Sequence, residues 1–187
     1  MKSGVLVFAA GMGLALVGCG GKEPAPVGGK GGQGMAKIEV TSTAFEPGAP
    51  IPKRYSRYGA DVTPPLAWSG VPEGTKEIVL ICDDPDAPVG TWVHWVFYGM
   101  PPGCTGLGEG FPRDKVLEDG SMQGKNSWGE IGYGGPQPPS GTHRYFFRVY
   151  AADAPTGLKP GATKGEVLKA LEGHVIGKGE LMGTYAK

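Results

Sequence analysis

Residues 77–88 read EIVLICDDPDAP, an apolar run that ends in three aspartates and two prolines. The run Ile78–Ile81 contains no polar residue, which is typical of a strand that is buried on both faces. Asp-Pro steps favour a turn, because proline presets one backbone angle and aspartate binds nearby backbone N–H groups. We therefore expect a central strand that brings carboxylates to its end.

Other segments extend this strand into a mainly β domain. Branched, aromatic or alternating apolar residues predict strands, and proline and glycine mark the turns between them. Thr163 and Glu166 have the spacing of a capping box, which predicts one short helix over Thr163–Gly173. We expect one or two short helices, long loops over residues 99–142, and strands over Lys37–Thr43, Leu66–Trp68, Glu77–Cys82, Thr91–Tyr98, Arg144–Ala151 and Ile176–Tyr185.

The composition excludes several classes of protein. Glycine (35 residues) and proline (18) are in excess, but 40% of the residues are hydrophobic and the charged residues cancel at 18 basic and 18 acidic. A disordered chain needs low hydrophobicity and high net charge, and collagen needs glycine at every third residue. A binder of nucleic acid would carry an excess of lysine and arginine. A single compact domain with many turns remains.

The first 35 residues are expected to lie outside that domain. Lys2 and the apolar stretch from Gly4 to Gly18 predict a signal peptide over residues 1–18. Leu16–Cys19 (LVGC) resembles the bacterial lipobox, whose cysteine carries a lipid. The sequence thus predicts a lipidated Cys19, a flexible tether over residues 19–35, a folded domain over residues 36–187, and a lipoprotein of the cell envelope that faces out of the cytoplasm, at the outer membrane or periplasmic face of a Gram-negative cell. An ordinary secretory peptide with a chance cysteine is the alternative.

Two polar clusters interrupt the apolar strands. One is Asp84–Pro88 followed by Trp92–Trp95, and the other is Gly132–Pro139 followed by Gly141–Tyr145. Strand alternation predicts Trp92, His94 and Val96 on one face and Val93 and Trp95 on the other, with His143 and Tyr145 together and Arg144 opposite. A simpler interpretation makes His94 a core histidine and the aspartates turn formers. Together, however, the clusters indicate a binding site.

These clusters resemble the two signature regions of the phosphatidylethanolamine-binding protein family, and more narrowly its bacterial branch, named for Raf kinase inhibitor protein. The resemblance extends from about Lys37 to Tyr185. It implies a β-sandwich-like fold, a cis turn at Pro88, an aromatic rim at Trp92 and a loop shaped by Pro136. Gln137 stands where the branch often has a cysteine, and whether Cys82 and Cys104 pair stays open. The implied pocket residues are Asp84, Asp86, His94, Gly135, His143 and Tyr145.

The expected function is binding of a small anionic or phosphorylated ligand, such as a phospholipid headgroup. We infer that His94 and His143, neutral or protonated, donate to its oxygens, together with the Tyr145 hydroxyl and backbone N–H groups near Gly135. Asp84 and Asp86 would orient the histidines or accept from an ammonium group. We expect no cofactor, no metal and no enzymatic activity. The alternatives are an inhibitor of a protease or kinase-like partner and, with less support, a metal-dependent enzyme that uses the two histidines and an aspartate.

Overall fold

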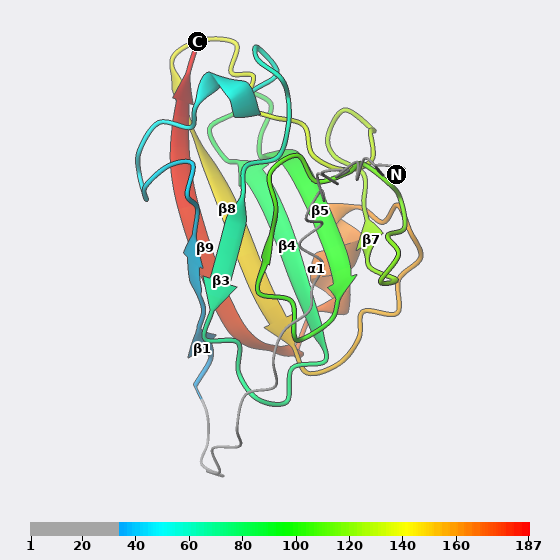
Figure 1. The fold of residues 1–187 in the computed structure, drawn as a ribbon. Coiled ribbons are helices and arrows are strands. Elements are labelled where there is room, and N and C mark those ends of the chain that lie inside the picture. Colours follow the sequence, from blue (N-terminus) through cyan, green and yellow to red (C-terminus); the bar gives the residue numbers. More distant parts are fainter. Residues whose placement is uncertain (1–33) are drawn as a thin grey trace, which may run out of the picture.

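The structure, a computed structural model, describes residues 34–187 and consists of two β-sheets packed face to face (Figure 1). The larger sheet has six strands. In spatial order they are β1 (Ala36–Lys37), β9 (Val175–Ala186), β8 (Thr142–Ala152), β4 (Glu77–Asp84), β5 (Trp92–Met100) and β7 (Met122–Gln123). All their pairings are antiparallel except that of β1 with β9.

The smaller sheet covers one face of the larger one. It consists of β2 (Glu39–Thr41), β3 (Leu66–Ser69) and β6 (Gly106–Leu107), in that order. The sequence predicted a single strand over Lys37–Thr43, but the chain leaves the larger sheet after Lys37 and enters the smaller sheet at Glu39. Ile38 and Val40 are both buried in the core, so the apolar alternation survives the change of sheet.

Strand β4 lies in the middle of the larger sheet and is buried along its whole length. Ile78 and Leu80 pack into the core between the two sheets, and Val79 and Ile81 pack into a second cluster on the opposite face. Burial of each such side chain stabilises the fold by about 1.5–3 kcal/mol. The prediction of a central strand buried on both faces is confirmed.

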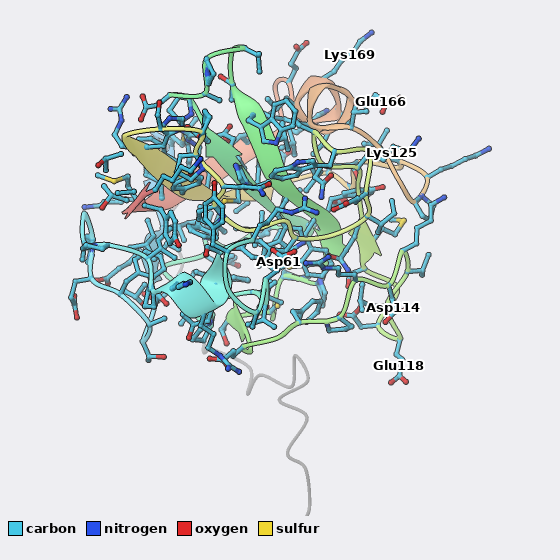
Figure 2. The ribbon with its side chains drawn as sticks, turned by 90° about the horizontal axis from the view of Figure 1, so that it is seen from above. Asp61, Asp114, Glu118, Lys125, Glu166 and Lys169 are labelled. Atoms are coloured by element: carbon cyan, nitrogen blue, oxygen red, sulfur yellow. The ribbon has the colours of Figure 1, made fainter. Side chains whose placement is uncertain are left out.

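Helix α1 (Lys164–Ala170) covers the second cluster. The Thr163 side chain accepts from the Glu166 backbone N–H and the Glu166 carboxylate accepts from the Thr163 N–H, so the predicted capping box is present. Figure 2 shows Glu166 at the start of this helix, on the same side of the molecule as Lys125. A short 3-10 helix spans Lys53–Tyr55. The mainly β architecture with one or two short helices is confirmed.

Residues between β5 and β8 form the long connections that the glycine and proline content predicted. Apart from β6 and β7, they contain only isolated bridges, such as Lys125 with Ile131. Over residues 34–187, no helix combines the length and the apolar character that crossing a bilayer requires.

The two ends of the larger sheet differ in what they carry. β1 pairs with β9 at Gly177 and Lys178, near the lower end in Figure 1. His143 pairs with Tyr185 at the other end, where the chain also terminates. At the rise of an extended strand, Gly177 and Tyr185 are about 26 Å apart. The polar clusters predicted from the sequence lie at the end that contains His143.

Candidate functional site

A cavity of about 200 Å³ opens at this end of the larger sheet, where β4 ends and β5 and β8 begin. Its polar floor comes from three buried side chains, and apolar residues from three loops form its rim. Pockets for drug-sized ligands measure about 300–1,000 Å³, so this one suits a smaller group. The lining residues are Asp84, Ala87, Pro88, Val89, Trp92, His94, Trp128, Gln137, Pro139 and His143.

Asp84 and His143 form a buried pair on the floor of the pocket. The His143 Nδ1–H donates to Asp84 Oδ2 at 2.7 Å, and only 3% of Asp84 and 7% of His143 is exposed. The second oxygen, Oδ1, accepts from the Asp86 backbone N–H, which is the turn contact expected of an Asp-Pro step. The bond at Nδ1 leaves His143 Nε2 on the opposite side of the ring.

His94 reaches the pocket because β5 contains a bulge at this residue. Cys82 pairs with Trp95 and Asp83 pairs with Val93, so His94 is an extra residue between two pairs. A bulge reverses the alternation of side chains along the strand. The prediction that Val96 shares the face of His94 is therefore wrong, because Val96 packs into the second cluster on the opposite face of the sheet.

The His94 side chain is bound to the loop that faces it. Its Nδ1–H donates to the Gly134 carbonyl oxygen at 2.6 Å, and the Gly134 N–H donates to the His94 carbonyl oxygen at 2.9 Å. Burial lowers the pKa of His94, although the Gly134 carbonyl and the Asp84 charge act in the opposite direction. The neutral ring with Nδ1 protonated presents Nε2 as an acceptor. This differs from the expectation that a neutral His94 donates to a ligand.

Aromatic rings enclose His94. The rings of Trp128 and Tyr145 each meet it edge to face, with centroids 5.1 Å away, and Trp92 meets Trp128 in the same way at 5.3 Å. The Arg57 guanidinium lies over the ring of Trp128, 4.2 Å from its centroid. Cation–π contact of this kind stabilises an exposed ring by about 0.5–1 kcal/mol. Trp128 thus shields the imidazole from solvent.

Three buried polar atoms around the pocket lack a well-aligned protein partner: Trp92 Nε1, His94 Nε2 and Tyr145 Oη. Burial, and then the negative charge of Asp84, raises the pKa of Tyr145, so its hydroxyl keeps its proton. Native proteins pair nearly all their buried polar groups, and an unpaired group costs about 1–3 kcal/mol. Three such atoms lie around one cavity, and of these the Tyr145 hydroxyl is also within reach of the Asp84 carboxylate and the Gln137 backbone.

The remaining predicted residues lie beside the pocket and do not line it. Asp86 binds Arg144 through both carboxylate oxygens, at 2.7 and 2.9 Å. The Gly135 N–H donates to Asp61 Oδ1 at 2.7 Å. Contrary to the expectation, this N–H is therefore already paired within the protein and does not donate to a ligand. The Pro136 carbonyl accepts from the Arg57 N–H at 3.1 Å and secures the loop.

Pro88 lies on the rim, but its predicted cis peptide bond is absent, since all peptide bonds in residues 34–187 are trans. The turn is made by Gly90, whose φ of 96° few other residues adopt, and by a hydrogen bond from its N–H to the Ala87 carbonyl. Val89 stands at the tip of this loop and is 76% exposed.

The sequence did not single out Trp128 as a pocket residue. It belongs to a glycine-rich loop with no periodic pattern, and it is placed by Asn126, whose side-chain oxygen accepts from the N–H groups of Trp128 and Glu130 at 3.0 Å. The only signal was a large apolar residue isolated among polar ones. Among the other lining residues, Ala87, Gln137 and Pro139 lie within the two predicted clusters but were not singled out as pocket residues, and Val89 lies outside them.

The remaining predictions concern cysteines and metals. Cys19, the predicted site of lipidation, lies outside the described residues, as do the signal peptide and all but the end of the tether. Cys82 and Cys104 do not form a disulfide with each other, and the Cys104 thiol contacts the Gly106 carbonyl oxygen at 3.6 Å. In the described part of the chain, no three His, Cys, Asp or Glu side chains are grouped as a metal site requires.

Comparison with known proteins agrees with the fold and the signature regions. The family model of the phosphatidylethanolamine-binding proteins matches residues 41–186. A UPF0098 protein of Methanothermobacter thermautotrophicus is 53% identical over 150 residues, which cover 80% of this chain and 99% of that protein. A UPF0098 protein of Chlamydia trachomatis is 44% identical over 155 residues, 80% of this chain and 99% of its own.

Two solved structures have the same architecture. The crystal structure of a phosphatidylethanolamine-binding protein homologue from Chlamydia trachomatis has a TM-score of 0.74 and 44% identity and covers 81% of this chain and 98% of its own. YbcL of E. coli, a member of the mammalian phosphatidylethanolamine-binding protein family, has a TM-score of 0.75 and 32% identity. It covers 80% of this chain and 98% of its own. The fold, the signature regions and these similarities together show that the chain belongs to the phosphatidylethanolamine-binding protein family.

Proposed function

We propose that this protein binds a small phosphorylated or otherwise anionic ligand, such as a phospholipid headgroup, in the pocket between Asp84, His94 and His143. The observation that carries the proposal is the cluster of buried polar atoms without a well-aligned partner, Trp92 Nε1, His94 Nε2 and Tyr145 Oη, beside a cavity of about 200 Å³. Ligand oxygens would accept from Trp92 Nε1–H and from the Tyr145 hydroxyl, and His94 Nε2 would accept from a donor of the ligand.

The charges of the pocket suit an oxyanion that comes with a positive or protonated group. Asp84 is the only carboxylate among the lining residues, and His143 already binds one of its oxygens. A protonated His143 would neutralise Asp84 and still offer Nε2–H to an anion. An ammonium group on the ligand could approach the carboxylate from the rim. Phosphorylethanolamine combines both kinds of group in a molecule of suitable size.

The test is calorimetric titration of the folded domain with phosphorylethanolamine at about pH 6, near the unperturbed pKa of histidine. We expect one site per chain and at least a tenfold loss of affinity in His143→Asn. His174→Asn is a matched control, because His174 binds Asp153 in an exposed pair with the same Nδ1 geometry, at 2.9 Å. Lack of binding by the wild type, or equal affinity in His143→Asn, would refute the proposal.

The same chemistry can come from a soluble phosphate ester or from a membrane lipid. Flotation with vesicles of phosphatidylcholine alone, and of phosphatidylcholine mixed with phosphatidylethanolamine, separates the two sources. Binding to mixed vesicles that free phosphorylethanolamine competes away would indicate a lipid headgroup. Binding of the soluble ester without any vesicle binding would indicate a soluble ligand.

We also propose that the protein is a lipoprotein attached through Cys19 to the cell envelope, on the side away from the cytoplasm. The support is the order of the LVGC motif, the glycine-rich segment and the domain in the sequence. Mass spectrometry of the N-terminal peptide of the mature protein tests this directly. A diacylated or triacylated Cys19 at the N-terminus is the expected result, and an intact Met1 or an unmodified Cys19 contradicts it.

A further inference from the structure

Both pocket histidines are held by the same ring nitrogen. His94 donates its Nδ1–H to the Gly134 carbonyl oxygen, and His143 donates its Nδ1–H to Asp84 Oδ2. In each ring, Nε2 is then the nitrogen left for a ligand. A neutral imidazole with Nδ1 protonated accepts at Nε2, and only the charged ring donates there. At their Nε2 atoms, the two histidines can therefore present two donors, two acceptors or one of each.

The partners of the two rings decide which histidine becomes charged. His143 binds a carboxylate, which stabilises a positive ring, whereas His94 binds an uncharged carbonyl. His94 is 98% buried and lies between the rings of Trp128 and Tyr145. Transfer of a charged ring from water to a buried site among aromatic rings costs free energy unless an opposite charge pairs with it. Burial accordingly lowers the pKa of His94. Of the two rings, His143 is the one whose hydrogen-bond partner is a carboxylate that can pair with a positive charge.

The charged and titratable groups that face the two rings do not alter this assignment. Asp84 at the end of β4 bonds to His143, and Tyr145 on β8 meets the edge of His94 with its proton retained. The Arg57 guanidinium packs on the ring of Trp128, which in turn meets the ring of His94, and Asp86 is neutralised by Arg144. On β9, Tyr185 pairs with His143 through the backbone, and its hydroxyl accepts from Ser56.

From this asymmetry, and resting on the proposed function, we infer that the pocket binds its ligand as a singly protonated oxyanion. The ligand O–H donates to His94 Nε2, and an ionised ligand oxygen accepts from His143 Nε2–H. Trp92 Nε1–H is left for a further oxygen. The preferred class is the hydrogen phosphate form of a monoester. A dianionic ester has no O–H, so one of its oxygens would place a lone pair against the lone pair of His94 Nε2. Its second negative charge would lie beside the Asp84 carboxylate.

The inference distinguishes ligands that have the same charge. Methyl phosphate below its second pKa, which is about 6 for phosphate monoesters, is a monoanion with one O–H. Methyl sulfate and dimethyl phosphate are monoanions without an O–H. They leave His94 Nε2 buried and unpaired, and a site that is built to bind a hydroxyl rejects analogues that lack it.

The test is calorimetric titration of the wild-type domain with methyl phosphate and methyl sulfate at about pH 5, where both are monoanions. We expect methyl phosphate to bind at least tenfold more tightly. The number of protons taken up on binding is then measured at about pH 8, where the free ester is a dianion, in buffers of different ionisation enthalpy. Binding of methyl phosphate should take up one proton more than binding of methyl sulfate. If methyl sulfate does not bind, binding of methyl phosphate should take up at least one proton.

Each result decides one of the two proposals. Equal affinities at pH 5, or binding of methyl phosphate at pH 8 without proton uptake, would overturn the present inference and leave the proposed anion site intact. Binding of neither ligand would overturn the present inference, and failure of phosphorylethanolamine to bind as well would overturn both. His94→Gln, if folded, can turn an amide N–H toward the pocket and should lose the preference for methyl phosphate. The control His174→Gln should keep it. The comparison of ligands on the wild type does not depend on either variant.

Discussion

His94 and Gly134 are joined by two hydrogen bonds, one from the imidazole Nδ1–H to the Gly134 carbonyl and one from the Gly134 N–H to the His94 carbonyl. The residue that offers Nε2 to the pocket thus also fixes the loop that forms the opposite wall. Because both bonds involve a buried group, the imidazole and the loop cannot move independently without leaving polar atoms unpaired. The site is preorganised through a single residue of β5.

Gly135→Ala should disrupt this wall. A Cβ atom at residue 135 would lie 2.2 Å from the Tyr55 carbonyl oxygen and 2.8 Å from the Ser56 Cα, and backbone atoms cannot rotate away. We expect a loss of about 1–3 kcal/mol in the free energy of unfolding and weaker binding of phosphorylethanolamine. Urea unfolding and calorimetry measure these effects. Gly108→Ala is the control, because its Cβ would meet nothing within 4 Å; unchanged stability in Gly135→Ala would contradict the packing described.

Arg144→Gln should return the carboxyl of Asp86 to an ordinary pKa. The side-chain hydrogen bond from Arg144 is the main cause that lowers the Asp86 pKa from 3.8 to about 2. The ionised pair stabilises the fold above the unfolded pKa of 3.8, and this stabilisation is lost as the pH falls through about 2. NMR titration of the Asp86 carboxyl should show a rise in its pKa in Arg144→Gln. Arg54→Gln, which breaks the pair with Glu109, should not change it.

His94 should make the protein less stable in acid. Burial lowers its pKa below 6.5, so between pH 6.5 and the folded pKa the unfolded chain binds a proton that the folded chain does not. Stability contributed by the neutral ring is complete above pH 6.5 and falls as the pH decreases. Urea unfolding at about pH 7 and pH 5 measures this loss. In His94→Asn the loss should be smaller than in the wild type; an equal loss in both proteins would contradict a neutral His94.

Glu77→Gln should reduce stability and leave binding unchanged. The buried Glu77 carboxylate accepts from the N–H groups of Gly99 and Thr156 and from the Thr156 hydroxyl, at 2.6–2.9 Å. An amide has one oxygen to accept with, so at least one buried donor loses its partner at a cost of about 1–3 kcal/mol. Thermal unfolding should show a lower Tm than in the exposed control Glu172→Gln. Because Glu77 begins β4 and the pocket lies at its end, loss of ligand affinity would contradict the separation of the two regions.

The fold was largely predictable because its elements have strong local signals. The apolar run Ile78–Ile81 predicted the central strand, and Thr163 with Glu166 predicted the start of α1. The bulge at His94 left no such signal, because one extra residue changes neither composition nor hydrophobicity. Alternation alone therefore placed Val96 on the wrong face.

The site was predictable only in part, for a related physical reason. Asp84, His94 and His143 line the pocket as the resemblance implied, since each lies on a strand or at its end. The use of the Gly135 N–H depends on Asp61, 74 residues earlier in the chain, and no local pattern reports such a contact. Trp128 is placed by a loop whose conformation depends on the Asn126 side chain.

The position of β1 has a consequence for how the pocket meets its surroundings. Chain that precedes Gly34 joins the domain at the end of β9 that contains Gly177, whereas the pocket lies at the Tyr185 end, beside the C-terminal Lys187. The opening of the pocket is therefore at the opposite end of the larger sheet from the place where the N-terminal segment enters the domain. Capture of the protein on a sensor chip by its N-terminus therefore keeps the point of attachment away from the pocket and leaves the pocket accessible.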